Sequence, residues 1–319
     1  MNWMEKTASG AAFVALLWPL RPVAAQGVPV APPPAPASRQ AAQNPSPMLE
    51  STRVHERLTT RVLGGTARSF HGPAGKPVEV WVPDRARSRD AFDVVIHFHG
   101  ASWLPHQAVA SLGSRTVAVA LTLGAGSGIY DRSFSDPMVF DTLLATVARE
   151  VSTVTGRPSR IARVTLVGFS AGHGAVRAIL RDPGHLARVD AVLLLDGMHT
   201  SYVPEGQVLA AGGTLDTMNL LSLTAFARAA ARGEKRMLIA HSEIFPGTYA
   251  STTETADWTV AALGLRRTPV LRWGPRGMQQ LSEVHAGRFR VLGFAGTTAP
   301  DHIDQLHAMP ELLKRLLSR

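Results

Sequence analysis

Residues 164–174 read VTLVGFSAGHG and join a strand pattern to a helix pattern. The apolar run that ends at Val167 predicts a buried strand, and residues 175–180 have the composition of a helix. Between them lies Gly168-Phe169-Ser170-Ala171-Gly172, a G-x-S-x-G sequence with a serine at its centre. Small residues two positions before and after a serine let strand and helix pass closely, so the turn can hold the hydroxyl in a strained backbone conformation. The stretch predicts a sharp turn that presents Ser170 as a nucleophile.

Strand and helix patterns alternate along most of the chain. Strands are predicted at 78–82, 94–98, 117–121, 161–167, 189–195, 237–240 and 289–294. Helices are predicted at 138–151, directly after Ser170, and at 215–231, 254–263 and 303–317. Strands separated by helices predict an α/β fold with a doubly wound, mainly parallel sheet flanked by helices. Ligands of such sheets bind at the carboxyl ends of the strands.

The first 50 residues do not have the composition of a folded domain. Lys6, the apolar segment 11–18 and the small residues 23–25 predict a signal peptide over 1–25. The apolar segment is too short to span a bilayer, so we expect no stable membrane insertion. Residues 26–50 are rich in proline and alanine and predict a disordered tether. We therefore expect a secreted or periplasmic protein with a single domain over 51–319.

Charge and composition exclude several classes of protein. The net charge of +9 comes mainly from arginines that are spread along the chain without a dense run, so we predict no nucleic-acid partner. The chain has no cysteine, which excludes disulfides and a thiol nucleophile. His97 and His99 alternate on one strand, but no aspartate or third histidine follows at a metallohydrolase spacing. We predict no metal and no cofactor.

A serine hydroxyl is a poor nucleophile until a base takes its proton and an acid orients that base. The loop after the last predicted strand, residues 295–302, ends in His302 immediately before a predicted helix. We therefore expect His302 to be the base. His307 lies more than a turn into that helix, and His285 precedes the last strand, so it is expected at the opposite edge of the sheet.

An oxyanion that develops on a carbonyl group needs two fixed N–H donors. Ala171 follows the serine, and its backbone N–H is predicted to supply one of them. The stretch 97–103, HFHGASW, follows an early strand and contains a His-Gly pair, which favours the N–H of Ala101 as the second. His99 is expected to shape this loop through a hydrogen bond.

The chain resembles the α/β-hydrolase superfamily over about residues 75–318. The resemblance rests on the strand-turn-helix around Ser170, which is the nucleophile elbow of that superfamily, on the His-Gly loop, on the order of elements and on the terminal histidine. Within it the chain looks similar to exported esterases without a large lid, because the region between 196 and 237 holds only one loop and one predicted helix. The resemblance implies a Ser-acid-His triad that hydrolyses small-molecule carboxylic esters through an acyl-serine intermediate.

Two positions compete for the acid of this triad. Asp196 follows the apolar residues 192–195, where a buried carboxylate is costly unless a partner such as a histidine meets it. Glu243 follows the next strand, which is the commoner position for the acid in the superfamily, but the segment 241–246 lacks an aspartate. We favour Asp196 and retain Glu243 as the alternative acid.

Three aromatic residues in or near the expected pocket loops are predicted to contact substrate: Trp103, Tyr130 and Tyr202. The loops are residues 124–136 and 198–213. Two other functions stay open, an acyltransferase with the same triad and a non-catalytic binding protein with this fold. A serine hydrolase is favoured because both the elbow serine and the terminal histidine are present.

Overall fold

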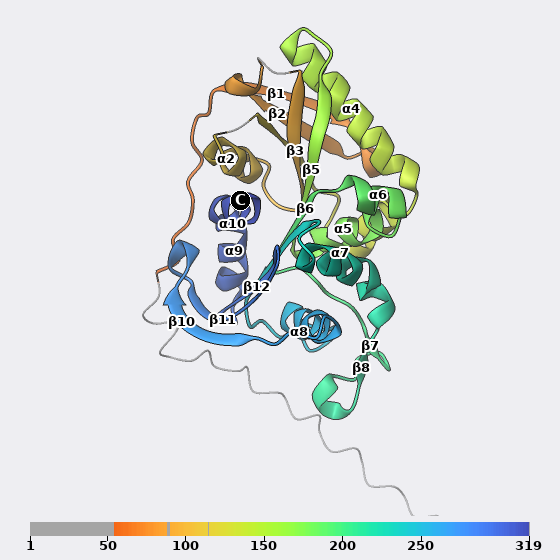
Figure 1. Ribbon diagram of the computed structural model, residues 1–319, viewed down its shortest axis with the longest axis vertical. Coiled ribbons are helices and arrows are strands. Elements are labelled where there is room, and N and C mark those ends of the chain that lie inside the picture. Colours follow the sequence, from red (N-terminus) through yellow and green to blue (C-terminus); the bar gives the residue numbers. More distant parts are fainter. Residues whose placement is uncertain (1–53, 88–89, 114, 319) are drawn as a thin grey trace, which may run out of the picture. The chain divides into compact units, whose positions relative to one another are not determined.

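The sheet is built from ten strands in the order β1-β2-β4-β3-β5-β6-β9-β12-β11-β10 (Figure 1), within the residues that the computed structural model describes, 54–87, 90–113 and 115–318. Those residues belong to one compact unit, Pro45–Arg319. The predicted signal peptide 1–25 and tether 26–50 lie outside the described residues. Within the described ranges, no helix has the length and apolar character needed to cross a membrane.

The strands that form the middle of the sheet all run in the same direction. Their bounds are β4 Thr116–Leu121, β3 Ala91–Phe98, β5 Arg160–Phe169, β6 Ala191–Leu195, β9 Arg236–His241 and β12 Phe289–Phe294. Antiparallel strands extend both edges: β1 Gly65–His71 and β2 Pro77–Pro83 on one side, β11 Gln279–Ala286 and β10 Thr268–Trp273 on the other. A short separate hairpin pairs β7 Tyr202–Val203 with β8 Thr214–Leu215. The predicted doubly wound, mainly parallel sheet is confirmed.

Helices cover both faces of this sheet (Figure 1). One face carries α2 Trp103–Ser111, α9 Ala299–His307 and α10 Met309–Leu317. The other carries α3 Ser127–Ser133, α4 Pro137–Thr155, α5 His173–Ile179, α6 Pro183–Arg188, α7 Leu221–Ala231 and α8 Thr252–Ala262. Alternate residues of one strand enter the two cores: Ile96 packs with the α4 side and Val95 with the α2 side.

Several elements were not expected from the sequence. The edge strands β1 and β10 are largely exposed, so they lack the dense apolar pattern of the central strands. Helix α2 is buried on more than one side, which removes the helical periodicity. The single helix predicted at 303–317 is instead two helices, α9 and α10. Pro310 cannot continue a helix from its interior, and it takes a position in the first turn of α10 instead.

The carboxyl ends of the central strands meet at one edge of the sheet. Phe98 at the end of β3 pairs with Gly168 of β5, and Phe169 pairs with Leu195 at the end of β6. Leu195 in turn pairs with Ala240 of β9. The loops that follow these strands contain Ser170, Asp196 and the predicted oxyanion residues, so strand pairing alone brings these residues to one edge.

Candidate active site

The elbow at the end of β5 is as tight as its glycines require. Ser170 has a φ of 46°, in the left-handed region that a non-glycine residue adopts only under constraint. A Cβ at Gly168 would lie 3.1 Å from the backbone nitrogen of His173, and one at Gly172 would lie 2.0 Å from the carbonyl oxygen of Phe98. Strand, turn and helix therefore come into backbone contact, and the expected strain at the serine is present.

A second strained residue lies next to the serine. Asp196, at the end of β6, has a φ of 43° and a buried side chain. The following Gly197 has no room for a side chain, because a Cβ there would lie 2.4 Å from the carbonyl oxygen of Ser170. The backbone after β6 therefore packs against the backbone of the elbow. Asp196, which directly precedes Gly197, is held close to Ser170.

The structure brings Asp196 and His302 together across 106 positions of sequence. The Nδ1 atom of His302 lies 2.8 Å from Oδ2 of Asp196. Ser242, directly after β9, holds the same carboxylate: its N–H donates to Oδ1 at 2.9 Å and its hydroxyl to Oδ2 at 2.6 Å. Burial alone raises the pKa of Asp196, but the hydrogen bond and charge of His302 and the two Ser242 donors more than offset it, so the pKa is lowered. The carboxylate is ionised at neutral pH.

The imidazole of His302 lies against Phe169, the residue that precedes Ser170. Its ring centroid is 4.6 Å from that of Phe169. The side chain is 25 % exposed, so part of the ring is accessible to solvent. Because Asp196 engages Nδ1, the nitrogen that remains to accept a proton is Nε2.

The other residues weighed for the acid and the base lie in different surroundings. Glu243 is exposed, and among the described residues its carboxylate has no hydrogen bond to His302, so the alternative acid is not supported. The Nδ1 atom of His307 accepts from the backbone N–H of Leu58. His285 pairs in register with Arg290, near the beginning of β12, which is the opposite edge of the sheet as expected.

The loop after β3 is fixed by hydrogen bonds beside the elbow. His99 has a φ of 73°, and its Nδ1 lies 2.9 Å from the hydroxyl of Tyr130. The N–H of His99 donates to Leu121, and the N–H of Gly100 donates to Thr122. The expectation that a hydrogen bond from His99 shapes the loop is met. Ala101 comes next in this loop, whose backbone these hydrogen bonds fix. Ala171 follows Ser170 in the elbow, and the elbow contacts the end of β3 through Gly172.

Two of the three aromatic residues predicted to contact substrate are interior residues instead. Tyr130 is fully buried in α3, where its hydroxyl accepts the N–H of Leu123. Tyr202 is buried as well, and its hydroxyl donates to Glu254. Neither side chain can touch a substrate in this structure. Trp103 begins α2, and its ring centroid lies 5.7 Å from that of His307.

A cleft of about 460 Å³ opens beside Ser170, and both loops that were expected to line the pocket reach it, through residues 125–127 and 199–201. The sequence did not predict the other contributions, which are His173 and Arg177 from α5, Asn219, and Tyr249, whose ring centroid lies 5.0 Å from that of His199. The predicted loop at 124–136 does reach the cleft, but most of it is the helix α3 rather than irregular chain. His173 directly follows the G-x-S-x-G sequence, and this position is the sequence feature that could have identified it as a residue of the site.

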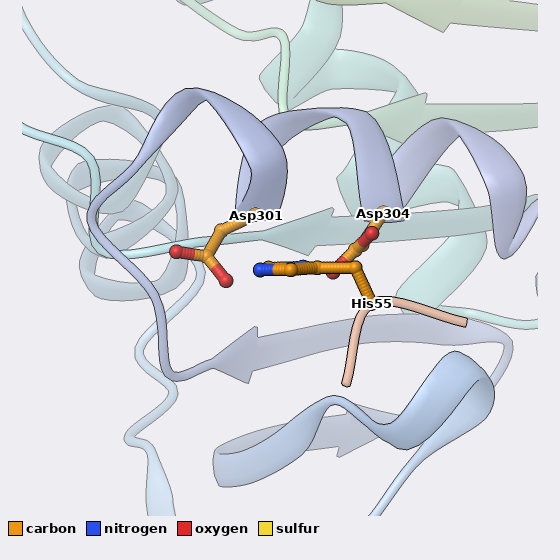
Figure 2. Close-up of side chains that lie close together, drawn as sticks. All are labelled: His55, Asp301 and Asp304. Carbon is orange, nitrogen blue, oxygen red and sulfur yellow. The ribbon is translucent and has the colours of Figure 1, made fainter. Parts of the chain in front are cut away.

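One cluster has the residue types of a metal site. His55, Asp301 and Asp304 each place a potential ligand atom within 4.8 Å of the others. Figure 2 shows the His55 ring between the two carboxylates of α9. Both oxygens of Asp304 already have partners, however: Nδ1 of His55 at 2.7 Å and Nε of Arg57 at 2.7 Å. The adjacent guanidinium opposes a cation, so these residues form an ion-pair cluster that attaches the segment around His55 to the helix of His302.

The strand order, the elbow after β5 and a histidine after the last parallel strand decide the architecture. The chain has the α/β-hydrolase fold. No family model matches the chain, and no curated protein matches it by sequence.

Solved structures give distant likenesses. An S-formylglutathione hydrolase from Agrobacterium tumefaciens is 12% identical over 81% of this chain and 98% of its own, with a TM-score of 0.47. The siderophore hydrolase EstB from Aspergillus nidulans is 12% identical over 82% of this chain and 96% of its own, with a TM-score of 0.43. A fungal esterase structure from Rhizomucor miehei is 12% identical over 81% of this chain and 85% of its own, also with a TM-score of 0.43. The fold assignment rests on the topology of this chain.

Proposed function

We propose that the protein is a serine hydrolase of small carboxylic esters. Ser170 is the nucleophile, His302 the general base and acid, and Asp196 the residue that orients His302 and stabilises its protonated form. The observation that carries the proposal is the 2.8 Å contact between Asp196 and His302, at the strand edge where the strained Ser170 lies. A buried, ionised aspartate on a partly exposed histidine, close to a serine with a left-handed backbone, supports this assignment of roles.

Acylation begins when Ser170 Oγ attacks the ester carbonyl carbon and Nε2 of His302 takes the hydroxyl proton. The carbonyl oxygen becomes an oxyanion, which the backbone N–H groups of Ala171 and Ala101 stabilise. Collapse of this intermediate breaks the bond to the alcohol oxygen. His302 returns its proton to that oxygen, so an alcohol leaves and an acyl-serine stays.

Deacylation repeats the sequence with water. His302 takes a proton from the water as its oxygen attacks the acyl-serine, and the same N–H groups stabilise the second oxyanion. The bond to Ser170 Oγ then breaks, His302 protonates the serine, and a carboxylic acid leaves. An acyltransferase differs only in that an alcohol takes the place of water.

We further propose that the protein is exported, so its substrates lie outside the cytoplasm. The support is the sequence of residues 1–25, with Lys6, an apolar segment and small residues at 23–25. N-terminal sequencing of the protein recovered from the cell envelope or medium tests this, with a mature chain that begins near Gln26 as the expected result. Full-length chain in the cytoplasmic fraction alone contradicts it.

Hydrolysis of p-nitrophenyl acetate tests the enzymatic proposal. The purified wild-type protein is expected to release p-nitrophenol, and Ser170→Ala to lower kcat by about 10⁵-fold with an unchanged unfolding midpoint, because the triad acts as a unit. Product analysis in water with and without added alcohol separates hydrolysis from acyl transfer. Equal activity of the wild type and the alanine variant contradicts the proposal.

A further inference from the structure

Most of the side chains that line the 460 Å³ cleft beside Ser170 carry a polar group. Hydroxyl, amide, imidazole and guanidinium groups line it, from Ser127, His173, Arg177, His199, Asn219 and Tyr249. The lining contains no large aliphatic side chain, and its apolar surface comes from alanines and from the non-polar parts of these polar residues. Binding pockets for apolar ligands are lined mainly by hydrophobic and aromatic side chains, so this cleft offers little to a long alkyl chain.

His173 fixes one wall of the cleft to the nucleophile. Its Nδ1 lies 2.8 Å from the carbonyl oxygen of Ser170, so Nδ1 carries the hydrogen and donates it. Its Nε2 then accepts the backbone N–H of His199 at 3.4 Å. Burial is the main reason that the pKa of His173 falls to about 3, so the ring is neutral and the tautomer is fixed. The segment around His199 is thereby held at a set position relative to Ser170.

The cleft holds several hydroxyls that carry no charge. His199 forms part of the wall: its Nδ1 lies 3.0 Å from the carbonyl oxygen of Ala250 and donates to it, its ring is also in hydrogen-bonding reach of the Asp196 backbone, and burial lowers the pKa of the ring. The hydroxyls of Ser127, Ser201 and Tyr249 have no hydrogen-bond partner within the part of the chain that the structure describes. These hydroxyls therefore remain to bind a ligand.

Arg177 is the positively charged residue of the lining, but its N–H donors are already hydrogen-bonded within the protein. Its Nε and Nη2 both lie 2.7 Å from Oδ2 of Asp131, and Nη1 lies 3.5 Å from the carbonyl oxygen of His199. The same carboxylate binds Arg181 through two further contacts. Arg177 therefore supports the wall and offers no complete donor pair to a carboxylate ligand.

We propose that this cleft binds a polyhydroxylated group of the ester, as in an acylated sugar or another acylated polyol. The inference rests on the proposed ester hydrolysis at Ser170 and names its substrate class. Hydroxyl groups both donate and accept, and so match the hydroxyls of Ser127, Ser201 and Tyr249. A site built to bind hydroxyls discriminates strongly against analogues that lack them, because its own polar groups then stay unpaired.

Matched ester pairs test the substrate class. Methyl 6-O-acetyl-glucopyranoside and cyclohexylmethyl acetate are both acetates of a primary alcohol on a six-membered ring, and they differ in the ring hydroxyls, the ring oxygen and the methoxy group. We expect kcat/KM to be at least about tenfold higher for the sugar ester. Methyl glycerate against methyl propanoate places the hydroxyls on the acyl side, so the pair with the larger ratio identifies which half of the ester enters the cleft.

A double variant links any preference to the cleft. Ser201→Ala with Tyr249→Phe removes two hydroxyls that have no partner in the described protein and leaves the triad intact. We expect the ratio of kcat/KM between the preferred hydroxylated ester and its deoxygenated analogue to fall about tenfold. Ser135→Ala, at an exposed serine whose hydroxyl binds the carbonyl oxygen of Arg132, is the matched control and should leave the ratio unchanged.

The outcomes separate this inference from the proposed function. Hydrolysis of p-nitrophenyl acetate without a preference for hydroxylated esters in either pair overturns the polyol inference and leaves the hydrolase intact. A greater kcat/KM for monomethyl succinate than for every hydroxylated ester also overturns it, in favour of an anionic substrate. A preference that survives in the double variant places the recognition elsewhere and overturns the role of the cleft. No hydrolysis of any ester contradicts the proposed function itself.

Discussion

Asp196 combines a buried, ionised side chain with a strained backbone at the end of a strand. It is buried at a strand end with a left-handed backbone, and three hydrogen-bond contacts from His302 and Ser242 meet its two oxygens. A carboxylate in that position is tolerable only because these partners are present. Its sequence position behind an apolar run predicted the partner, and the structure supplies His302.

We expect Asp196→Asn to lower kcat for p-nitrophenyl acetate by about 10⁴-fold, because an amide neither stabilises the imidazolium nor holds the correct tautomer. Glu243→Gln, at the exposed alternative position, should change kcat less than twofold. Steady-state kinetics of both variants at pH 8 provides the comparison. A dead Glu243→Gln beside an active Asp196→Asn reverses the assignment.

The elbow illustrates what can be predicted for an element. The glycines around Ser170 predicted a close approach of strand and helix, but they did not identify the neighbour. That neighbour is the end of β3, because the oxygen of Phe98 occupies the space that a side chain at Gly172 would need. Strand adjacency is set by pairing between β3 and β5, which are separated in sequence by β4 and α4.

We expect Gly172→Ala to lower the free energy of unfolding by about 1–3 kcal/mol or to prevent folding, since its Cβ would overlap the Phe98 carbonyl. Gly126→Ala is the control, because a Cβ there meets nothing within 4 Å and its φ of −96° suits alanine. Urea unfolding followed by circular dichroism measures both. Equal free energies of unfolding for the two variants would show that the elbow backbone accommodates the added Cβ without loss of stability.

The helix that carries His302 is held from the amino-terminal side of the chain. Arg57 donates to the fully buried Asp304 and to the carbonyl oxygen of Pro300, so it attaches to α9 on both sides of His302. These contacts span more than 240 positions, and no local pattern predicted them. The segment is therefore part of the framework of the site.

We expect Arg57→Ala to lower the free energy of unfolding by about 2 kcal/mol and to lower kcat, since a buried carboxylate loses a charged donor and α9 loses an attachment. Arg61→Ala, an exposed arginine on the same segment, should stay within about 0.5 kcal/mol of the wild type. Urea unfolding and p-nitrophenyl acetate kinetics measure the two effects. If both variants behave alike, the segment does not support the helix.

The sequence predicted the parallel sheet of the molecule, the strand ends that carry Ser170 and Asp196, and a histidine after the last parallel strand. His302 was expected in the loop before the last helix, but it lies in the first turn of α9. The sequence also predicted the two loops that line the cleft, 124–136 and 198–213, but not the side chains that α5 and Tyr249 contribute. The burial of Tyr130 and Tyr202 depends on how α3 and α8 pack, and aromatic side chains in loops look the same in sequence whether they face solvent or core. His173 and His199 form a wall only because β6 lies next to β5.

Buried histidines should make the whole fold sensitive to acid. Burial is the main cause that lowers the pKa of His97 and His173 to about 3 and that of His241 to about 4, from an ordinary 6.5. Between those values the unfolded chain binds protons that the folded chain does not, so stability is complete above pH 6.5 and is lost as pH falls. The loss is about 1.4 kcal/mol per pH unit for each histidine.

Urea unfolding at intervals from pH 8 to pH 4.5 measures this dependence. We expect a plateau above pH 6.5 and a steep decline below it. His241→Gln should reduce the slope, whereas His285→Gln, at an exposed position, should leave it unchanged. A flat profile down to pH 5 means that these rings are not held neutral in the folded state.

The proposed hydrolysis depends on activation of the Ser170 hydroxyl by His302. Reaction with a fluorophosphonate probes this activation, because the reagent modifies only a serine whose proton has been taken by a positioned base. Peptide mass spectrometry is expected to find one adduct, on Ser170, and none after the histidine is replaced in His302→Ala. An adduct on a different serine, or undiminished labelling of Ser170 in His302→Ala, contradicts the account.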